Sequence, residues 1–440
     1  MKNKVLSRVL AVIIALMIFA VGFVAGYFTH GCTRDTAVQS YEWFVKTVDD
    51  NYYFGNSSDF KNMNLKEIAE KYLDRYSEYY TAEEYSAQLK SNAGSKSGLG
   101  VSYSYIEGKG IYLSSVVGNS PAYNCNSQLN KKGLRAGEIL VSGTANGVEK
   151  TFKSKADFAQ IVNAAGDREM TFTSADGETF TVAKAEYTAS YAYMCTNKTA
   201  WVFGDAASGG LALYEREYEK ISYLPEGFAY INLSQFYGTA AQEFYKLIEK
   251  FNATGCTSLI LDLRSNGGGY VSVMQDIAGC FSGGQVKPAM ISRDKHGSSQ
   301  VYNCARVAEA SRVKEGTEVF VLANSGTASA SEALIGAMHC YGALEYENIF
   351  LSDYSEEYLA FTGSEKTACT YGKGIMQSTF ENHATGEALK LTTAQIYWPD
   401  GETCIHDRGI IASDGCKKVY AEWQYTKGDP ELQRAIEMMK

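Results

Sequence analysis

The chain has 440 residues, a hydrophobic share of 45% and an aromatic share of 13%, with 32 Tyr. This length exceeds what one hydrophobic core organises, so two or three domains are expected, and the apolar content excludes global disorder. The net charge of -9, without a long stripe of Lys or Arg, provides no basic surface for a phosphate backbone. A nucleic-acid partner is therefore not expected.

A stretch of 20 residues without a charge, 9–28, lies near the N-terminus. As a helix rising about 1.5 Å per residue it would cross roughly 30 Å of hydrocarbon, so it predicts a single-pass transmembrane anchor. Because Lys2, Lys4 and Arg8 precede it, the N-terminus is expected in the cytoplasm and the rest of the chain outside the cell membrane. A cleaved signal peptide is the alternative, although no Ala-x-Ala-like site follows.

Ten cysteines are scattered through the chain without a C-x-x-C pair or finger-like spacing, so metal binding is not expected. Cys280 and Cys340 fall in apolar helical stretches, where buried free thiols are the ordinary interpretation. Cys404 and Cys416 are the pair to test for a disulfide, which the sequence alone does not decide.

Residues 37–89 carry apolar side chains at near-helical spacing and no Pro, which predicts a helical packing segment. A Gly/Ser/Lys-rich stretch at 92–98 marks a boundary. From 98 to 187, short β-like runs such as 111–117 and 170–173 surround one helix at 154–165, as in a small β-rich domain.

From residue 191 onward, apolar strands alternate with helices, which predicts a mostly parallel sheet covered by helices. Thr239 and Gln242 form a candidate capping box, and the apolar stripe that follows them is expected in the core. The expected strands are 229–233, 259–263 and 319–323, and the expected helices are 239–251, 271–281 and 329–340.

Two strings in this half place small residues directly after an apolar strand. The first runs into Gly267, Gly268 and Gly269, which indicates unusual φ values or a close backbone approach and offers free N–H donors. A tight turn is its alternative, and the G-x-G-x-x-G spacing of dinucleotide sites is missing. The second begins a helix near Ser329, where unpaired N–H groups and the helix dipole favour developing negative charge. Capping and close packing are its alternative.

A serine nucleophile needs a base, and the five His residues lie in no G-x-S-x-G or H-E-x-x-H pattern. Lysine is the remaining candidate, although most lysines are simply solvated. Lys373 lies between two glycines beside apolar residues, with Gln377 four positions on. To act as a base near neutral pH, a lysine must lower its pKa from about 10.4 to about 7, at about 4 kcal/mol, which apolar burial can supply.

In chain order, the strings Asp-Leu-Arg-Ser-Asn-Gly-Gly-Gly, Ser-Ala-Ser-Glu and Tyr-Gly-Lys-Gly-Ile-Met-Gln resemble those of the C-terminal processing peptidases, the tail-specific proteases of family S41. The resemblance implies an α/β core of the crotonase/ClpP-like ββα type and a serine-type peptidase that needs no metal or cofactor. In it, Ser329 corresponds to the nucleophile of a Ser-Lys dyad, Lys373 to the base, and Gln377 to the group that positions the lysine. The N–H of Ala330 and one from Gly267 or Gly268 would form the oxyanion hole.

The resemblance covers most of the chain after the predicted anchor. Segments 98–101, 119–122 and 133–140 are similar to landmarks of a PDZ domain, whose groove adds a peptide as an extra strand and holds its carboxylate on loop N–H groups. An ordinary strand start is the alternative for 98–101. The implied substrates are extracytoplasmic proteins with free C-terminal tails, and a homo-oligomer stays open. The carboxylate-binding N–H groups are expected from Leu99, Gly100 and Val101.

The predicted division is a cytoplasmic N-terminus and anchor at 1–30, a helical segment packing on the core at 31–95, a PDZ-like domain at 96–187 and the peptidase core at 188–440. Because Ser329 and Lys373 are farther apart than the family usually shows, residues 341–368 are expected to contain an insertion. Two other functions stay open: a catalytically silent PDZ scaffold that binds tails, and a crotonase-like acyl-CoA enzyme on a related fold.

Overall fold

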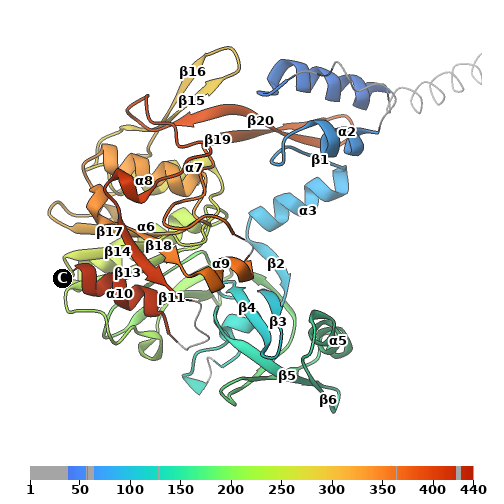
Figure 1. The fold of residues 1–440 in the computed structure, drawn as a ribbon, viewed down its shortest axis with the longest axis vertical. Coiled ribbons are helices and arrows are strands. Elements are labelled where there is room, and N and C mark those ends of the chain that lie inside the picture. The colour runs from blue at the N-terminus through green and yellow to red at the C-terminus, as the bar shows by residue number, and fades with distance from the viewer. Residues whose placement is uncertain are drawn as a thin grey trace, which may run out of the picture. The chain divides into compact units, whose positions relative to one another are not determined.

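The computed structural model describes residues 38–55, 57, 64–126, 129–362, 364–422 and 428–439 (Figure 1). The predicted anchor, 9–28, lies outside these ranges, and within them no helix is both long and apolar enough to cross a bilayer. The chain forms two compact units. The first joins the segment up to Ala87 with Gln377–Ala394, and the second comprises Gln88–Met376 and Gln395–Lys440.

The first unit packs helices against a β-strand that comes from late in the sequence. Residues 38–51 are helical, and the other elements are α2 (Leu65–Tyr72), β1 (Glu78–Tyr80), the start of α3 (Ala82–Asn92), β19 (Ile375–Glu381) and most of β20 (Ala388–Tyr397). β1 pairs antiparallel with the start of β20. Of the predicted helical stretch 37–89, residues 38–51, 65–72 and 82–89 are helical, whereas 52–55 and 73–81 are not, and residues 37, 56 and 58–63 lie outside the described ranges. Residues 377–394, which the sequence division placed in the peptidase core, belong to this unit, whose hydrophobic core includes Phe44, Val48, Ile68, Leu389 and Leu391.

A β-rich module, residues 95–188, opens the second unit. It contains β2 (Ser95–Gly98), β3 (Val101–Ile106), β4 (Gly110–Val116), α4 (Pro121–Asn124), β5 (Ile139–Ala145), β6 (Val148–Thr151), α5 (Lys155–Ala165), β7 (Met170–Ser174), β8 (Thr179–Val182) and β9 (Ala185–Thr188). The main sheet has the order β3-β4-β5-β7-β8, so β3 lies at its edge. The predicted helix is confirmed, and Ser154 caps it by accepting the N–H of Asp157.

The rest of the second unit is built on an eight-stranded sheet. Its strands are β10 (Ala192–Cys195), β11 (Ala200–Asp205), β12 (Leu211–Glu215), β13 (Phe228–Leu233), β14 (Ser258–Asp262), β17 (Glu318–Ala323), β18 (Ile349–Tyr354) and β21 (Lys417–Ala421). The order is β12-β11-β10-β13-β14-β17-β18-β21, with parallel pairing from β13 to β21. The predicted parallel sheet is confirmed, and the antiparallel extension β10 to β12 was not predicted.

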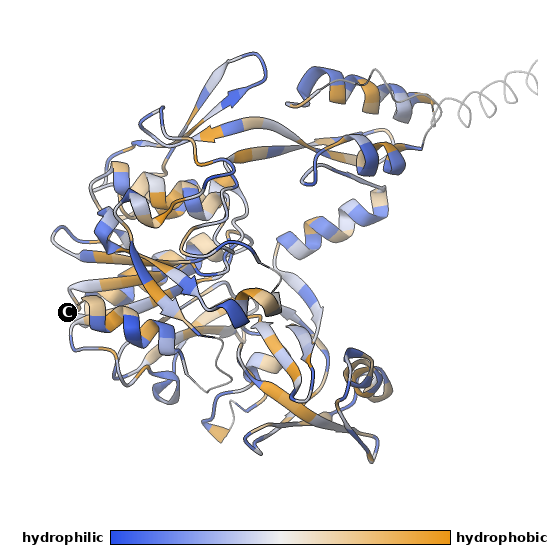
Figure 2. Ribbon diagram, in the orientation of Figure 1, coloured by the Kyte–Doolittle hydropathy of each residue, from blue (hydrophilic) through white to orange (hydrophobic). Residues whose placement is uncertain are grey.

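Helices cover both faces of this sheet. Side chains of α6 (Ala240–Thr254), α7 (Val271–Gly279) and α8 (Ala330–Cys340) share one core with Leu259 and Leu261, while α10 (Pro430–Met439) packs on the other face with Ile260. This alternation follows from the two-residue period of a strand. Figure 2 shows apolar residues concentrated in these strands and on the covered sides of the helices.

Three local expectations require correction or completion. Thr239 forms no capping box with Gln242, because its hydroxyl donates to Glu243 Oε1 at 2.6 Å. Cys340 is exposed at the end of α8, although Cys280 is buried as expected. The segment 341–368 contributes the core strand β18 and then α9 (Glu356–Thr362). The remaining elements are the hairpin strands β15 (Pro288–Asp294) and β16 (Ser299–Asn303).

Candidate active site

The turn between β17 and α8 holds Ser329 in a strained backbone conformation. Ser329 precedes the first residue of α8 with φ 58° and ψ -116°, a region that non-glycine residues rarely occupy. Its side chain is half-buried, and Ala330 begins the helix with an N–H that has no acceptor inside the helix. A hydrogen bond also fixes this turn: the Thr327 hydroxyl donates to the carbonyl of Leu263 at 2.8 Å.

The glycine-rich loop after β14 lies directly against this turn. Gly268 has φ +95°, and a Cβ on it would lie 2.9 Å from both Ser329 Cβ and the Ala330 nitrogen. Only a glycine fits this approach. The Gly268 N–H already donates to Asn266 Oδ1 at 2.9 Å, whereas Gly267 is exposed, and a Cβ added to it would meet no other atom within 4 Å. Of the two predicted donors, Gly267 is therefore the one whose N–H can meet a ligand without first breaking that bond.

Buried Glu332 ties the serine turn to the lysine loop. Its Oε2 accepts the backbone N–H groups of Ser329 and Lys373, both at 2.9 Å. Its Oε1 accepts the Gly372 N–H at 2.8 Å and the Thr370 hydroxyl at 2.5 Å. The side chain is fully buried, and this burial raises the pKa of Glu332 while its four hydrogen bonds oppose the rise. One carboxylate thus holds the backbones of both predicted dyad residues.

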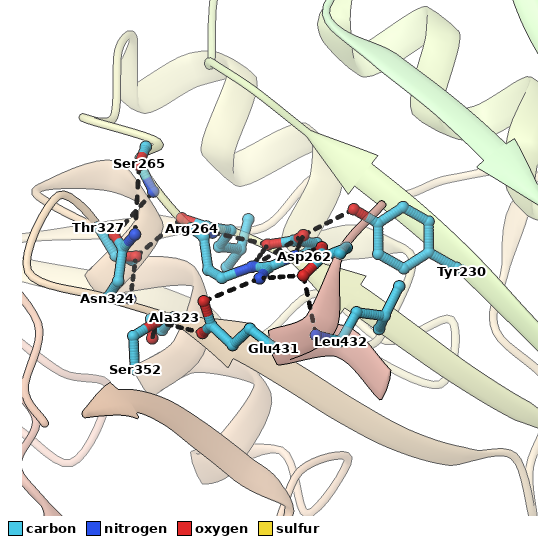
Figure 3. A network of polar contacts seen from close by, with 12 residues as sticks. Tyr230, Asp262, Arg264, Ser265, Ala323, Asn324, Thr327, Ser352, Glu431 and Leu432 are labelled. Carbon is cyan, nitrogen blue, oxygen red and sulfur yellow. Dashed lines mark hydrogen bonds and ion pairs between the residues drawn. The ribbon is translucent and has the colours of Figure 1, made fainter. Parts of the chain in front are cut away.

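A second polar network anchors the start of the glycine-rich loop, as Figure 3 shows. The guanidinium of Arg264, whose side chain is 13% exposed, pairs with Asp262, Asp429 and Glu431. Asp429 and Glu431 lie just before and within the first turn of α10, so the C-terminal helix reaches the loop through these carboxylates. Burial would raise the pKa of Asp429, but Arg264 outweighs it and lowers that pKa. For Glu431, burial dominates and raises the pKa.

Asn324 connects this network to the serine turn. Its Oδ1 accepts the N–H group of Ser265 at 2.8 Å (Figure 3). The same oxygen accepts the Gly326 N–H at 2.9 Å, and Nδ2 donates to the Tyr354 hydroxyl at 2.7 Å. Glu431 also accepts a hydrogen bond from Ser352 of β18. The glycine-rich loop and the serine turn are therefore linked both through their backbones and through buried side chains.

The predicted tail-binding residues line a separate cavity in the β-rich module. Leu99, Gly100 and Val101 contribute to a cavity of about 430 Å³ between β3 and α5. A Cβ on Gly100, which has φ +79°, would lie 2.2 Å from Ser120 Cβ, so the loop needs a glycine there. Because β3 lies at the edge of its sheet, the strand beside the cavity can accept another strand.

Gln377 belongs to the first compact unit, where its Nε2 donates to the Thr392 hydroxyl at 3.0 Å. Among the described residues, no group of three or more His, Cys, Asp or Glu side chains is arranged to hold a metal ion. Cys404 and Cys416 are both free, so no disulfide joins them in this structure.

The profile of peptidase family S41 matches residues 227–345, which include both the glycine-rich loop and Ser329. A relative named as a CtpA-like serine protease, from Staphylococcus haemolyticus, is 24% identical over 383 residues, covering 86% of this chain and 65% of the relative. The carboxy-terminal processing protease CtpA of Bacillus subtilis is 30% identical over 180 residues, covering 41% of this chain and 33% of that protein. Over residues 227–345 the chain is therefore similar to peptidase family S41.

The relatives that it resembles include proteins named as carboxy-terminal processing proteases. A crystal structure of an S41-family protein from Bacteroides fragilis matches with a TM-score of 0.53 at 13% identity, covering 90% of this chain and 96% of that one, which supports the shared fold. The S41 match leaves out Lys373 and the β-rich module, since both lie outside 227–345. The chain spans about two thirds of the length of the staphylococcal relatives.

Two groups around the candidate site had no role predicted from sequence. Glu332 was visible only as the last residue of Ser-Ala-Ser-Glu, three positions after Ser329, which is the spacing of a capping box. Its contacts to the lysine loop come from residues about 40 positions away. Asp429, the partner of Arg264 just before the C-terminal helix, is 165 positions from it, and no local pattern identifies it.

Proposed function

We propose that the chain is a serine endopeptidase that cleaves proteins at or near their C-terminal tails. In this mechanism neutral Lys373 takes the proton of the Ser329 hydroxyl as the oxygen attacks a peptide carbonyl. The N–H groups of Ala330 and Gly267 then stabilise the oxyanion. The protonated lysine donates to the leaving amine, and water hydrolyses the acyl-enzyme in a second step with the same base.

The contact between Gly268 and the Ser329–Ala330 backbone carries this proposal. It brings a loop of main-chain donors against a serine at a helix N-terminus, which is where negative charge is stabilised. The bonds from Glu332 to the Ser329 and Lys373 backbones support the pairing of these two residues. Gln377 keeps its proposed role of positioning the lysine.

The β-rich module supplies the proposed specificity. Its cavity beside the edge strand β3 suits an extended peptide that adds to the sheet, as in PDZ domains, with its terminal carboxylate on the N–H groups of Leu99, Gly100 and Val101. From the sequence of residues 9–28 we further propose a membrane-anchored, extracytoplasmic enzyme.

The dyad is tested with Ser329→Ala and Lys373→Met in the full chain. Both variants should lose cleavage of an unfolded protein with a free tail by at least about 1000-fold, as removal of a nucleophile or base does in other serine hydrolases. A fluorophosphonate should label the parent chain and the control Ser325→Ala, whose serine lies in the same turn, but not Ser329→Ala. Cleavage that persists in Lys373→Met would disprove the lysine base. Labelling that persists in Ser329→Ala would show that another residue is the nucleophile.

A further inference from the structure

The cavity in the β-rich module has an apolar wall with distinct positions along it. Leu99, Val101 and Tyr103 line it from the β3 side, and Phe158 and Val162 line it from α5. The rings of Tyr103 and Phe158 lie 4.5 Å apart, so the wall changes from aliphatic near Val101 to aromatic near Tyr103. An extended peptide would present alternate side chains to these two positions.

The charged side chains that line this cavity are both cations, Lys96 and Lys184. The chain as a whole carries 50 acidic and 41 basic residues, so two lysines without an acidic residue in this lining depart from its composition. No ion pair of either lysine occurs among the described residues. The site therefore carries a local positive charge that a ligand can neutralise.

Lys96 lies in β2 and Lys184 directly precedes β9, and both line the cavity near Gly98. Gly98 pairs with Ala185, the residue after Lys184, and Lys96 is two residues before Gly98 on β2. Glu186, the nearest acidic residue on β9, pairs with Ser97 and is exposed. Glu186 is not among the residues that line the cavity.

A tail bound along β3 with its carboxylate at Gly100 assigns one position to each feature. The last side chain meets the aliphatic wall formed by Leu99 and Val162, and the third from the end meets the Tyr103–Phe158 pair. The penultimate side chain alternates away from both. The chain-end carboxylate provides one negative charge for two lysines, which leaves the charge of one lysine without a counterion.

We propose that this cavity selects protein tails with two negative charges at the end, namely the free chain carboxylate and an Asp or Glu side chain at the penultimate position, followed by an aliphatic last residue. This inference rests on the tail-binding role proposed above and adds the substrate class. Lys96 and Lys184 are then the specificity-determining residues of the β-rich module.

The test measures binding of fluorescein-labelled peptides to the full-length Ser329→Ala chain by fluorescence anisotropy. Peptides ending in Glu-Val, Gln-Val and Glu-Val-amide differ only in the charges in question. At low ionic strength the Glu-Val acid should bind roughly 2- to 5-fold more tightly than the Gln-Val acid, in line with a partly exposed ion pair, and the amide should bind weakest. Added salt should reduce these differences.

The lysines are tested by Lys96→Met with Lys184→Met, which keeps the aliphatic stems. This double variant should bind the Glu-Val and Gln-Val acids equally, while the control Lys131→Met, an exposed lysine of the same module that does not line the cavity, should keep the preference. Equal binding of the two acids to the parent, or an unchanged preference in the double variant, overturns the inference. Hydrolysis of an unfolded protein by the wild-type chain reports on the dyad separately, so loss of tail binding alone would leave the proposed peptidase activity standing.

Discussion

The substitution Glu332→Gln tests whether one buried carboxylate holds the two predicted dyad residues in place. Glutamine has nearly the same shape, so it creates no cavity. Its amide group, however, can offer acceptors on one side only, while the carboxylate accepts two donors on each oxygen. In whichever orientation the amide settles, two buried donors face an NH2 group.

The magnitude follows from those two lost bonds. Hydrogen bonds to charged groups contribute about 1.5 to 3 kcal/mol each, so losing two of them costs about 3 to 6 kcal/mol of stability. Burial raises the pKa of Glu332, so holding the charge inside the protein costs free energy, and a neutral glutamine avoids that cost. This gain offsets part of the loss, and the free energy of unfolding should fall by about 3 kcal/mol. With an unfolding entropy of about 2.1 cal/mol/K per residue, this lowers the Tm of a chain of this size by roughly 3 to 5 °C. A displacement of about 1 Å between the serine turn and the lysine loop would lower kcat by about 100-fold.

The assay combines thermal unfolding, fluorophosphonate labelling of Ser329 and cleavage of an unfolded substrate. Labelling and kcat should fall together, whereas peptide binding in the β-rich module should stay unchanged because Glu332 does not line that cavity. Glu345→Gln, an exposed glutamate shortly after α8, is the matched control and should behave like the parent chain. A Glu332→Gln chain with parental Tm and labelling rate would refute the positioning role.

Two other variants test the loops around Ser329. Gly268→Ala should abolish labelling and lower Tm, because its Cβ would lie 2.9 Å from Ser329 Cβ at a φ of +95°. The control Gly267→Ala should keep the parental Tm, since its Cβ meets no other atom within 4 Å. Equal Tm values for the two variants would contradict the close approach of Gly268 to Ser329. Asp429→Asn weakens the hold on Arg264 and should lower kcat more than it raises KM. Since the pKa of Asp429 is lowered from 3.8, its ionised form stabilises the fold above that pH, and this contribution disappears as the pH falls through the lowered value. The Tm measured by circular dichroism should therefore fall less for Asp429→Asn than for the parent as the pH is lowered through this range.

Local patterns in the sequence predicted much of the fold. The helices α6 and α8 were predicted close to their observed positions, from the apolar stripe of α6 and the small residues at the start of α8. This was possible because the repeat of apolar residues on a buried helix face is visible within a single segment. Antiparallel β10 to β12 were not predicted, since short strands near a sheet edge carry little apolar signal. β1 was missed for a related reason: three residues inside a helical stretch form a strand only because β20 pairs with them.

The candidate site could be predicted in part for a similar physical reason. Ser329, Gly267 and Gly268 lie at strand ends, where small residues after an apolar run stand out in the sequence. Glu332 and Arg264 act through partners far along the chain, so their roles depend on tertiary contacts that no local pattern contains. The occupation of the Gly268 N–H by Asn266 Oδ1 is equally a property of the folded loop.

The arrangement of the site depends on the register between β14 and β17. These strands pair in parallel with Asp262 opposite Leu322, and the Leu263 N–H donates to the Leu322 carbonyl at 2.9 Å. Parallel neighbours end at the same edge of a sheet, so this register brings the glycine-rich loop to the serine turn before any side chain of the site is considered. A slip of one residue would move the buried face of β14 to the other side and carry Gly268 away from Ser329. The apolar side chains that fix the register, Leu259 and Leu261 on one face and Ile260 on the other, therefore determine the geometry of the site as directly as the polar groups that line it.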